Sequence, residues 1–131
     1  MASMTDYLEV ALLNHLLNNS ALTSPATVYC ALLSVTGDDT AASETELSGN
    51  GYARQAISFG TPNATSGVCT NDAAVTFSAS GGAWSAAVGF AIFDSLTTGN
   101  KLFYGALDAS RTAGDGDDLT FDIGALSVTL A

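Results

Sequence analysis

The sequence predicts a mainly β protein: an antiparallel β-sandwich or small barrel of about seven strands with one N-terminal amphipathic helix. Three observations support this fold class. Leucines recur at helical spacing near the N-terminus, and after Pro25 the apolar residues change to the two-residue period of strands or to short buried runs. Turn signals rich in glycine, asparagine and aspartate separate those segments. The chain shows no repeat and no linker, so residues 1–131 are expected to form one domain.

The first predicted element is the helix. Between residues 8 and 17, five leucines form a broad apolar stripe at helical spacing. Ser3 and Asp6 match a capping box in which aspartate replaces the usual glutamate, and Asn18 is a stop signal. We therefore predict a helix over residues 5–18, and we expect it to cover an edge or an open end of the sheets.

Seven strands are predicted in the rest of the chain. They are residues 27–34, 51–59, 73–78, 84–94, 101–107, 119–123 and 126–130. The first strand is apolar on both faces, as a central buried strand is. The strand over residues 84–94 places Trp84, Phe90 and Ile92 on one face, which predicts that they belong to the core. Its other face carries small residues around Gly89, where a neighbour can pack closely. Thr-Thr-Gly-Asn at residues 97–100 predicts a hairpin to the next strand.

Charge excludes several functions. Thirteen acidic residues stand against three Lys and Arg, for a formal net charge of −10. Three cations cannot form the basic patch that phosphate contacts need, so no nucleic-acid partner is expected. The longest mostly apolar stretch, residues 83–93, is too short for a membrane helix, so no membrane partner is expected either. The N-terminus lacks the basic and apolar regions of a secretory signal, which favours synthesis in the cytoplasm.

No catalytic, cofactor or metal site is predicted. Acidic residues cluster in residues 37–50 and 114–118, but without the spacing of a calcium-binding EF-hand, so solvated loops are the stronger interpretation and a structural calcium the weaker one. His15 is the single histidine, and no partner for a metal or nucleophile pair lies near it in the sequence. Cys30 fits a buried strand, and a disulfide with Cys69 is possible in principle but not expected in a reducing cytoplasm. We therefore expect that the chain is not an enzyme.

Three residues stand out as candidate interface or structural residues: Tyr7, Tyr52 and Arg54. Aromatic side chains dominate the energetics of protein interfaces, but each tyrosine can equally belong to the core. Arg54 lies within a strand that is otherwise mostly apolar. It is either an exposed arginine whose stem covers apolar surface, or the partner of a carboxylate within the chain or across a subunit boundary.

Taken together, the segments resemble a family of small bacteriophage virion proteins that are commonly labelled tail fibre or tail proteins. The family pattern is a leading helix, a strand of the type "vyvaLh", a "GgYaRq.i.f" strand and a "W..v..f.ifda..gg.lly.g.l" hairpin. The matching residues are Gly51, Tyr52, Ala53, Arg54 and Gln55 in the second strand block, and Trp84, Phe90, Phe93, Asp94, Leu102, Tyr104 and Gly105 in the hairpin. The resemblance extends over roughly residues 5–130 and implies a structural role in the virion, in many copies and without a catalytic site.

The resemblance leaves the position in the virion open. The small size favours a capsid decoration or cement protein on the outer surface of the major capsid protein shell, made in the host bacterial cytoplasm. The alternative is a tail fibre or tail-associated adaptor protein bound to other tail proteins, and a receptor- or glycan-binding module is a further alternative. In each case we expect a homo-oligomer, with a trimer as one candidate, and acidic loops that face water.

Overall fold

The computed structural model describes residues 2–40 and 43–130. Within them the chain forms ten strands in antiparallel sheets and one N-terminal helix, which confirms the predicted mainly β class. The elements are β1 (Ser3–Met4), α1 (Asp6–Leu17), β2 (Val28–Val35), β3 (Thr45–Glu46), β4 (Gln55–Ile57), β5 (Val68–Thr70), β6 (Val75–Ser78), β7 (Ala87–Phe93), β8 (Lys101–Arg111), β9 (Asp118–Phe121) and β10 (Ser127–Thr129). The sheets that these strands form do not close into a barrel.

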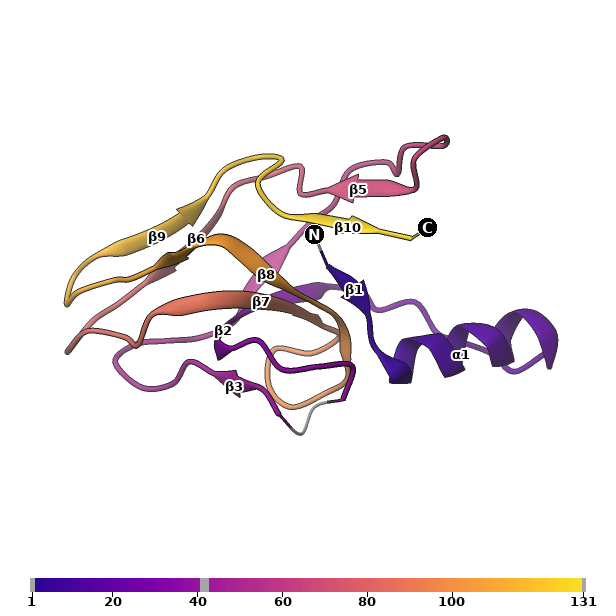
Figure 1. Ribbon diagram of the computed structural model, residues 1–131, viewed down its shortest axis with the longest axis horizontal. Helices are drawn as coiled ribbons and strands as arrows, with labels where there is room; N and C mark the ends of the chain where they lie inside the picture. Colours follow the sequence, from indigo (N-terminus) through magenta and orange to yellow (C-terminus); the bar gives the residue numbers. More distant parts are fainter. Residues whose placement is uncertain (1, 41–42, 131) are drawn as a thin grey trace.

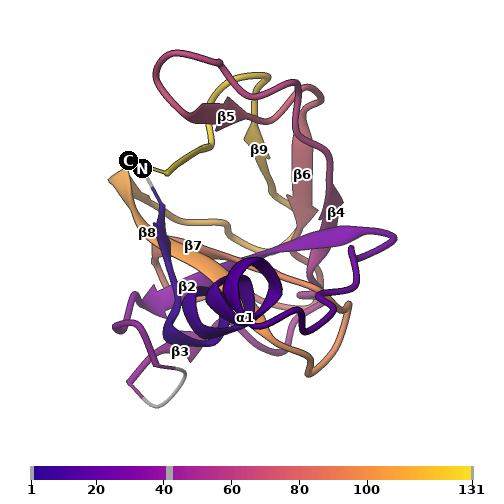
Figure 2. The same cartoon turned by 90° about the vertical axis from the view of Figure 1, so that its right-hand side faces the viewer.

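The main layer is a six-stranded sheet with the order β1-β8-β7-β2-β3, in which β4 pairs with β2 beyond the end of β3. The second layer consists of two ribbons, β5–β10 and β6–β9, which lie over opposite ends of the main sheet (Figures 1 and 2). β2 and β7 are the central strands, and Cys30 pairs with Ile92 and Ala31 with Ala91. All residues from Cys30 to Leu33 are fully buried, so the first predicted strand is central, as expected.

The core lies between the two layers. Phe77 of β6 meets Phe121 of β9 edge to face, with ring centroids 6.2 Å apart, and both belong to one cluster with Phe90 of β7. Trp84 and Ile92 join this cluster, which confirms their predicted place in the core. Burying each such side chain stabilises the fold by about 1.5–3 kcal/mol relative to exposing it. The core therefore joins strands from both layers.

The close approach predicted near Gly89 is also present. A Cβ atom on Gly89 would lie 2.5 Å from the hydroxyl oxygen of Thr36 and 2.9 Å from the carbonyl oxygen of Gly105. Both distances are too short for real carbon–oxygen contacts, so only glycine fits between these neighbours without a shift.

The predicted strand count of about seven is too low, and the predicted bounds change. β1, β3 and β5 are two or three residues long, too short to carry a periodic pattern, and β3 and β5 lie in segments that we expected to be loops. Conversely, only Gln55–Ile57 of the predicted strand 51–59 is a strand. Gly51 has a φ of +78°, and the Tyr52 amide donates to the Gly49 carbonyl oxygen, so the segment turns there before it extends.

Helix α1 is one residue shorter at each end than the predicted range 5–18, and its cap differs from the predicted one. Thr5 is the N-cap residue: its hydroxyl accepts from the Leu8 amide at 3.4 Å and donates to the Lys101 carbonyl oxygen at 2.6 Å. The expected capping box is wrong because Ser3 belongs to β1, where it pairs with Tyr104. The helix ends before Asn18, as predicted.

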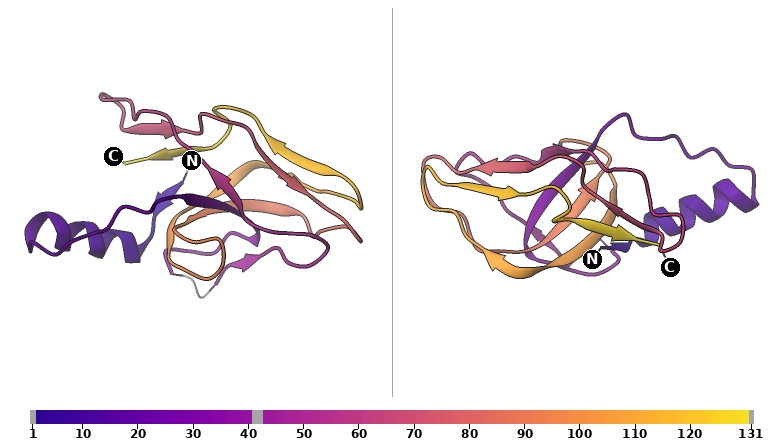
Figure 3. Two further views of the ribbon diagram at one scale, coloured as in Figure 1. Left: turned by 180° about the vertical axis from the view of Figure 1, so that it is seen from behind. Right: turned by 90° about the horizontal axis from the view of Figure 1, so that it is seen from above.

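The expectation that the helix covers an edge or open end of the sheets is wrong. α1 projects from one end of the sandwich, beyond the layers, with only its first turn near β1 and β8 (Figures 1 and 3). None of its 12 residues is buried. The reason is that the β1–β8 pairing holds the start of the helix at the sheet edge and directs its axis away from the core.

Candidate interaction surfaces

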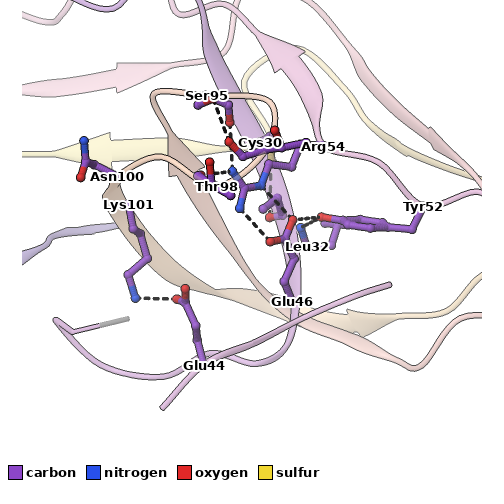
Figure 4. Close-up of polar contacts among 12 residues, drawn as sticks. Cys30, Leu32, Glu44, Glu46, Tyr52, Arg54, Ser95, Thr98, Asn100 and Lys101 are labelled. Carbon is purple, nitrogen blue, oxygen red and sulfur yellow. Dashed lines mark hydrogen bonds and ion pairs between the residues drawn. The ribbon is translucent and has the colours of Figure 1, made fainter. Parts of the chain in front are cut away.

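Arg54 lies at the centre of a polar cluster between two loops. Its Nε and Nη2 atoms donate to the two carboxylate oxygens of Glu46 on β3, each at 2.9 Å. Its Nη1 atom donates to the carbonyl oxygens of Ser95 and Thr98 in the β7–β8 hairpin, at 2.9 and 2.7 Å (Figure 4). The guanidinium also lies 3.6 Å from the centroid of the Phe93 ring. This bidentate geometry is the strong form of an arginine–carboxylate pair, and the pair forms within the chain.

Tyr52 belongs to the same cluster through its contact with Glu46. Its hydroxyl donates to Glu46 at 2.9 Å and accepts from the Leu32 amide at 3.0 Å. Its ring stacks on Phe77 and meets Trp84 edge to face, so most of the side chain packs in the core. Burial raises the pKa of Tyr52, which keeps the hydroxyl protonated. The structure therefore places Tyr52 and Arg54 together, in a cluster that ties β3 and the segment before β4 to the sheet.

Lys101 forms a second internal pair. Its side chain is almost fully buried at the start of β8, and its Nζ donates to the Glu44 carboxylate and to the carbonyl oxygens of Asp38 and Thr40. The expectation that the acidic segment 37–50 mostly faces water is therefore wrong for two of its carboxylates: Glu44 pairs with Lys101, and Glu46 pairs with Arg54. The reason is that burying a cation requires a carboxylate beside it.

Arg111 is the third cation of the chain, and it too has partners within the fold. Its Nη2 atom donates to the Thr120 carbonyl oxygen at 3.0 Å, and its guanidinium lies 5.0 Å from the centroid of the Phe121 ring. Since the sequence holds three Lys and Arg residues, every one of them makes a contact inside the chain.

Tyr7, the third candidate, lies apart from this cluster on the first turn of α1. It is 45% exposed. It adjoins a row of exposed apolar side chains on the same helix. The helical periodicity identified these residues as apolar but did not predict that they are exposed. These residues are Val10, Leu13, Leu16 and Leu17, with exposed fractions of 59%, 56%, 67% and 75%. This row is the largest group of exposed apolar side chains on any one element among the described residues.

A separate apolar groove of about 270 Å³ opens between the main sheet and the β5–β10 ribbon. Residues of several strands line it, among them Val28, Phe59, Cys69, Ile92, Phe103 and Val128. Sequence reasoning missed this groove because its lining residues come from distant segments that only the sheet topology brings together.

His15, Cys30 and Cys69, which the sequence analysis weighed as nucleophile or metal-ligand candidates, each have contacts of their own within the fold. The ring Nδ1 of His15 lies 3.2 Å from the Leu22 amide and 3.3 Å from the Ser20 carbonyl oxygen, so the segment that follows the helix engages it. Both cysteines are free thiols, and burial raises the pKa of the Cys30 thiol to about 12. Cys69 donates to the Gly60 carbonyl oxygen. Among residues 2–40 and 43–130, no group of three or more His, Cys, Asp or Glu residues could hold a metal ion.

In the part of the chain that the structure describes, no helix is long and apolar enough to span a bilayer.

Comparison with known proteins gives one family. The family model described as "Podophage GP4 fiber I protein gp80" matches residues 3–129, which is nearly the whole chain. No curated protein matches at a significant level. The match confirms the resemblance to phage tail fibre and tail proteins that the sequence motifs indicate. The chain belongs to the podophage GP4 fiber I protein gp80 family and is a structural protein of a bacteriophage fibre, a component of the virion.

Proposed function

We propose that this protein is a building module of a podophage tail fibre, present in several copies and joined to other tail proteins by direct protein contacts. The observation that carries the proposal is the family match over residues 3–129, which favours the tail over the capsid position that size alone favoured. A sandwich whose two central strands are buried suits a structural module.

The electrostatics support a protein partner rather than a nucleic acid. The formal net charge is −10, and the three Lys and Arg residues each make contacts within the fold, so the chain offers no cluster of free cations to contact phosphate. Contacts to partners then depend on apolar and hydroxyl side chains. A position on the outer part of the virion agrees with this acidic surface, which repels other particles in solution.

The proposal includes no catalytic role. Neither thiol has a histidine as a hydrogen-bond partner among the described residues, and burial makes the Cys30 thiol a poor nucleophile. The proposed role is therefore limited to contacts with other proteins of the fibre.

Fractionation of purified virions tests the proposal. Particles are separated into heads and tails, and peptides of this chain are quantified in each fraction against peptides of the major capsid protein. We expect the chain in the tail fraction at a small fraction of the capsid protein's copy number. Recovery with the heads, at a copy number comparable to that of the capsid protein, would instead support a capsid decoration protein.

A further inference from the structure

Strand β8 has a free outer edge in its second half. β8 is 11 residues long, and β1 pairs with it only at Phe103 and Tyr104. On the other edge, the pairing with β7 shifts register between Ala106 and Arg111. In the described structure, Leu107–Ser110 therefore has no ladder partner on either side. An unpaired edge presents backbone N–H and C=O groups at the spacing that another strand matches.

The free edge borders a hollow of about 280 Å³, which we call the β8 seam. One wall is the edge itself, residues 106–109 and Arg111, and the other is formed by residues 125–127 at the start of β10. The buried rings of Phe90 and Phe121 lie between the walls. Since β8 belongs to the main sheet and β10 to the second layer, the β8 seam is a place where the sandwich is open.

The chain's own β1 already bridges the same two layers beside the seam. Ser3 and Met4 pair antiparallel with β8, and Ala2 forms a parallel bridge to Val128 of β10 (Figure 1). The Ala2 amide also donates to the carbonyl oxygen of Ser127, which lines the seam, at 3.1 Å. The part of the gap next to the seam is therefore occupied by extended backbone. This neighbour favours an extended segment as the occupant, over a helix or a small molecule, because such a segment can use the free groups of β8.

The walls of the seam also indicate which side chains suit the occupant. Phe90, Phe121 and Leu126 offer apolar contact, so an apolar side chain fits against them. Asp108 is exposed on the wall and forms no ion pair in the described part of the chain. The chain has a formal net charge of −10, so a basic side chain beside Asp108 is attracted and an acidic one is repelled.

We propose that the β8 seam accepts an extended segment of a neighbouring virion protein, which adds as a strand to the free edge of β8, in line with β1. The segment carries apolar residues and a Lys or Arg that meets Asp108. That the neighbour is a tail protein rests on the proposed function, whereas the strand addition does not.

The first test is a titration of the purified full chain with a peptide, followed by backbone amide NMR. The probe is a blocked six-residue peptide of alternating Val and Thr with one central Lys. Its counterpart carries N-methyl groups that remove the N–H donors of one edge. We expect saturable shifts in residues 105–111 and 125–127, and binding at least about tenfold weaker for the N-methylated peptide, because several hydrogen bonds are lost. No shift in these residues, or equal binding of the two peptides, overturns the proposal.

The variant Asp108→Lys tests the charge. It should weaken binding of the Lys peptide by about fivefold and strengthen binding of a Glu peptide, because an exposed pair changes sign. Asp118→Lys is the matched control: Asp118 is exposed on β9, outside the seam, and its substitution should change neither affinity. Trp84 fluorescence checks that both variants are folded. Equal effects of the two substitutions would show that net charge alone acts and would contradict the assigned contact.

The second test identifies the occupant in the virion. A photo-crosslinking phenylalanine replaces Ala109, which is exposed in the seam, or Asp118 as the control. A cross-link from residue 109 to a segment of another virion protein, and none from residue 118, supports the proposal. No cross-link from residue 109, or one to a second copy of this chain, overturns it. If the cross-linked segment belongs to the major capsid protein, strand addition holds and the tail assignment fails, so the two failures are distinguishable.

Discussion

Replacing Arg54 with methionine should destabilise the folded protein strongly. The methionine retains the apolar stem but removes the guanidinium, and with it the contact with the Phe93 ring and four hydrogen bonds: two to Glu46 and two to the carbonyl oxygens of Ser95 and Thr98. The Arg54 side chain is 8% exposed and the Glu46 side chain 27%. The substitution therefore leaves a mostly buried carboxylate without its counter-ion.

The expected loss is about 3 kcal/mol of unfolding free energy. Removing one partner of a buried pair costs about 3–5 kcal/mol, and the partial exposure of Glu46 lets water reduce that cost to the lower end. Tyr52 still donates to the carboxylate, which also limits the loss. For a chain of this size, about 3 kcal/mol lowers Tm by roughly 10 °C.

The assay is urea unfolding followed by Trp84 fluorescence, with Arg111→Met as the matched control. Arg111 makes one hydrogen bond to a carbonyl oxygen and has no carboxylate partner in the described structure, so its replacement should cost about 1 kcal/mol. A cycle with Glu46→Gln should give a coupling energy of at least about 1 kcal/mol. If Arg54→Met stays within about 0.5 kcal/mol of the wild type, the arginine only covers apolar surface, and the argument for the cluster fails.

Two further predictions concern titratable groups. In the native protein, only the thiol of Cys69 should react with Ellman's reagent, because Cys30 is fully buried and its pKa is raised to about 12. The Cys69→Ser variant should react only after unfolding. A thiol that reacts rapidly in the folded variant would contradict the buried position of Cys30. Stability should also fall at high pH. A hydrogen bond to the Asp39 carboxylate raises the pKa of Tyr104 to about 12, and burial raises that of Tyr52, whereas tyrosines in the unfolded chain ionise near pH 10. Because the folded-state pKa values are the higher ones, this stabilisation is complete below pH 10 and is lost as pH rises toward 12. Urea midpoints between pH 8 and 11 should fall less steeply for Tyr52→Phe than for the wild type, and parallel slopes would refute the assignment.

The sequence carries enough information for the central strands and for one hairpin. The run from Cys30 to Leu33 is apolar at every position, which is typical of a strand buried on both faces. The β7–β8 turn is predictable because Gly99 adopts a positive φ, which glycine does readily, whereas the positive φ of Thr98 is one that a β-branched residue rarely adopts and no local pattern predicts. These signals are local, so a single sequence reveals them.

The polar cluster and the short strands could not be predicted in this way. The sequence contains 13 acidic residues, and any of them could in principle pair with Arg54. Glu46 is the partner because β3 pairs with β2, and no local sequence pattern encodes that pairing. Lys101 and Glu44 lie 57 residues apart. The exposure of α1 was missed for a related reason. Periodicity identifies which residues are apolar, but it does not tell whether the chain's own core or another molecule covers them.

A cryo-electron microscopy reconstruction of the purified virion would test the central claim most directly. The account predicts density for the sandwich in the tail fibres. Density for the sandwich on the capsid shell would contradict it.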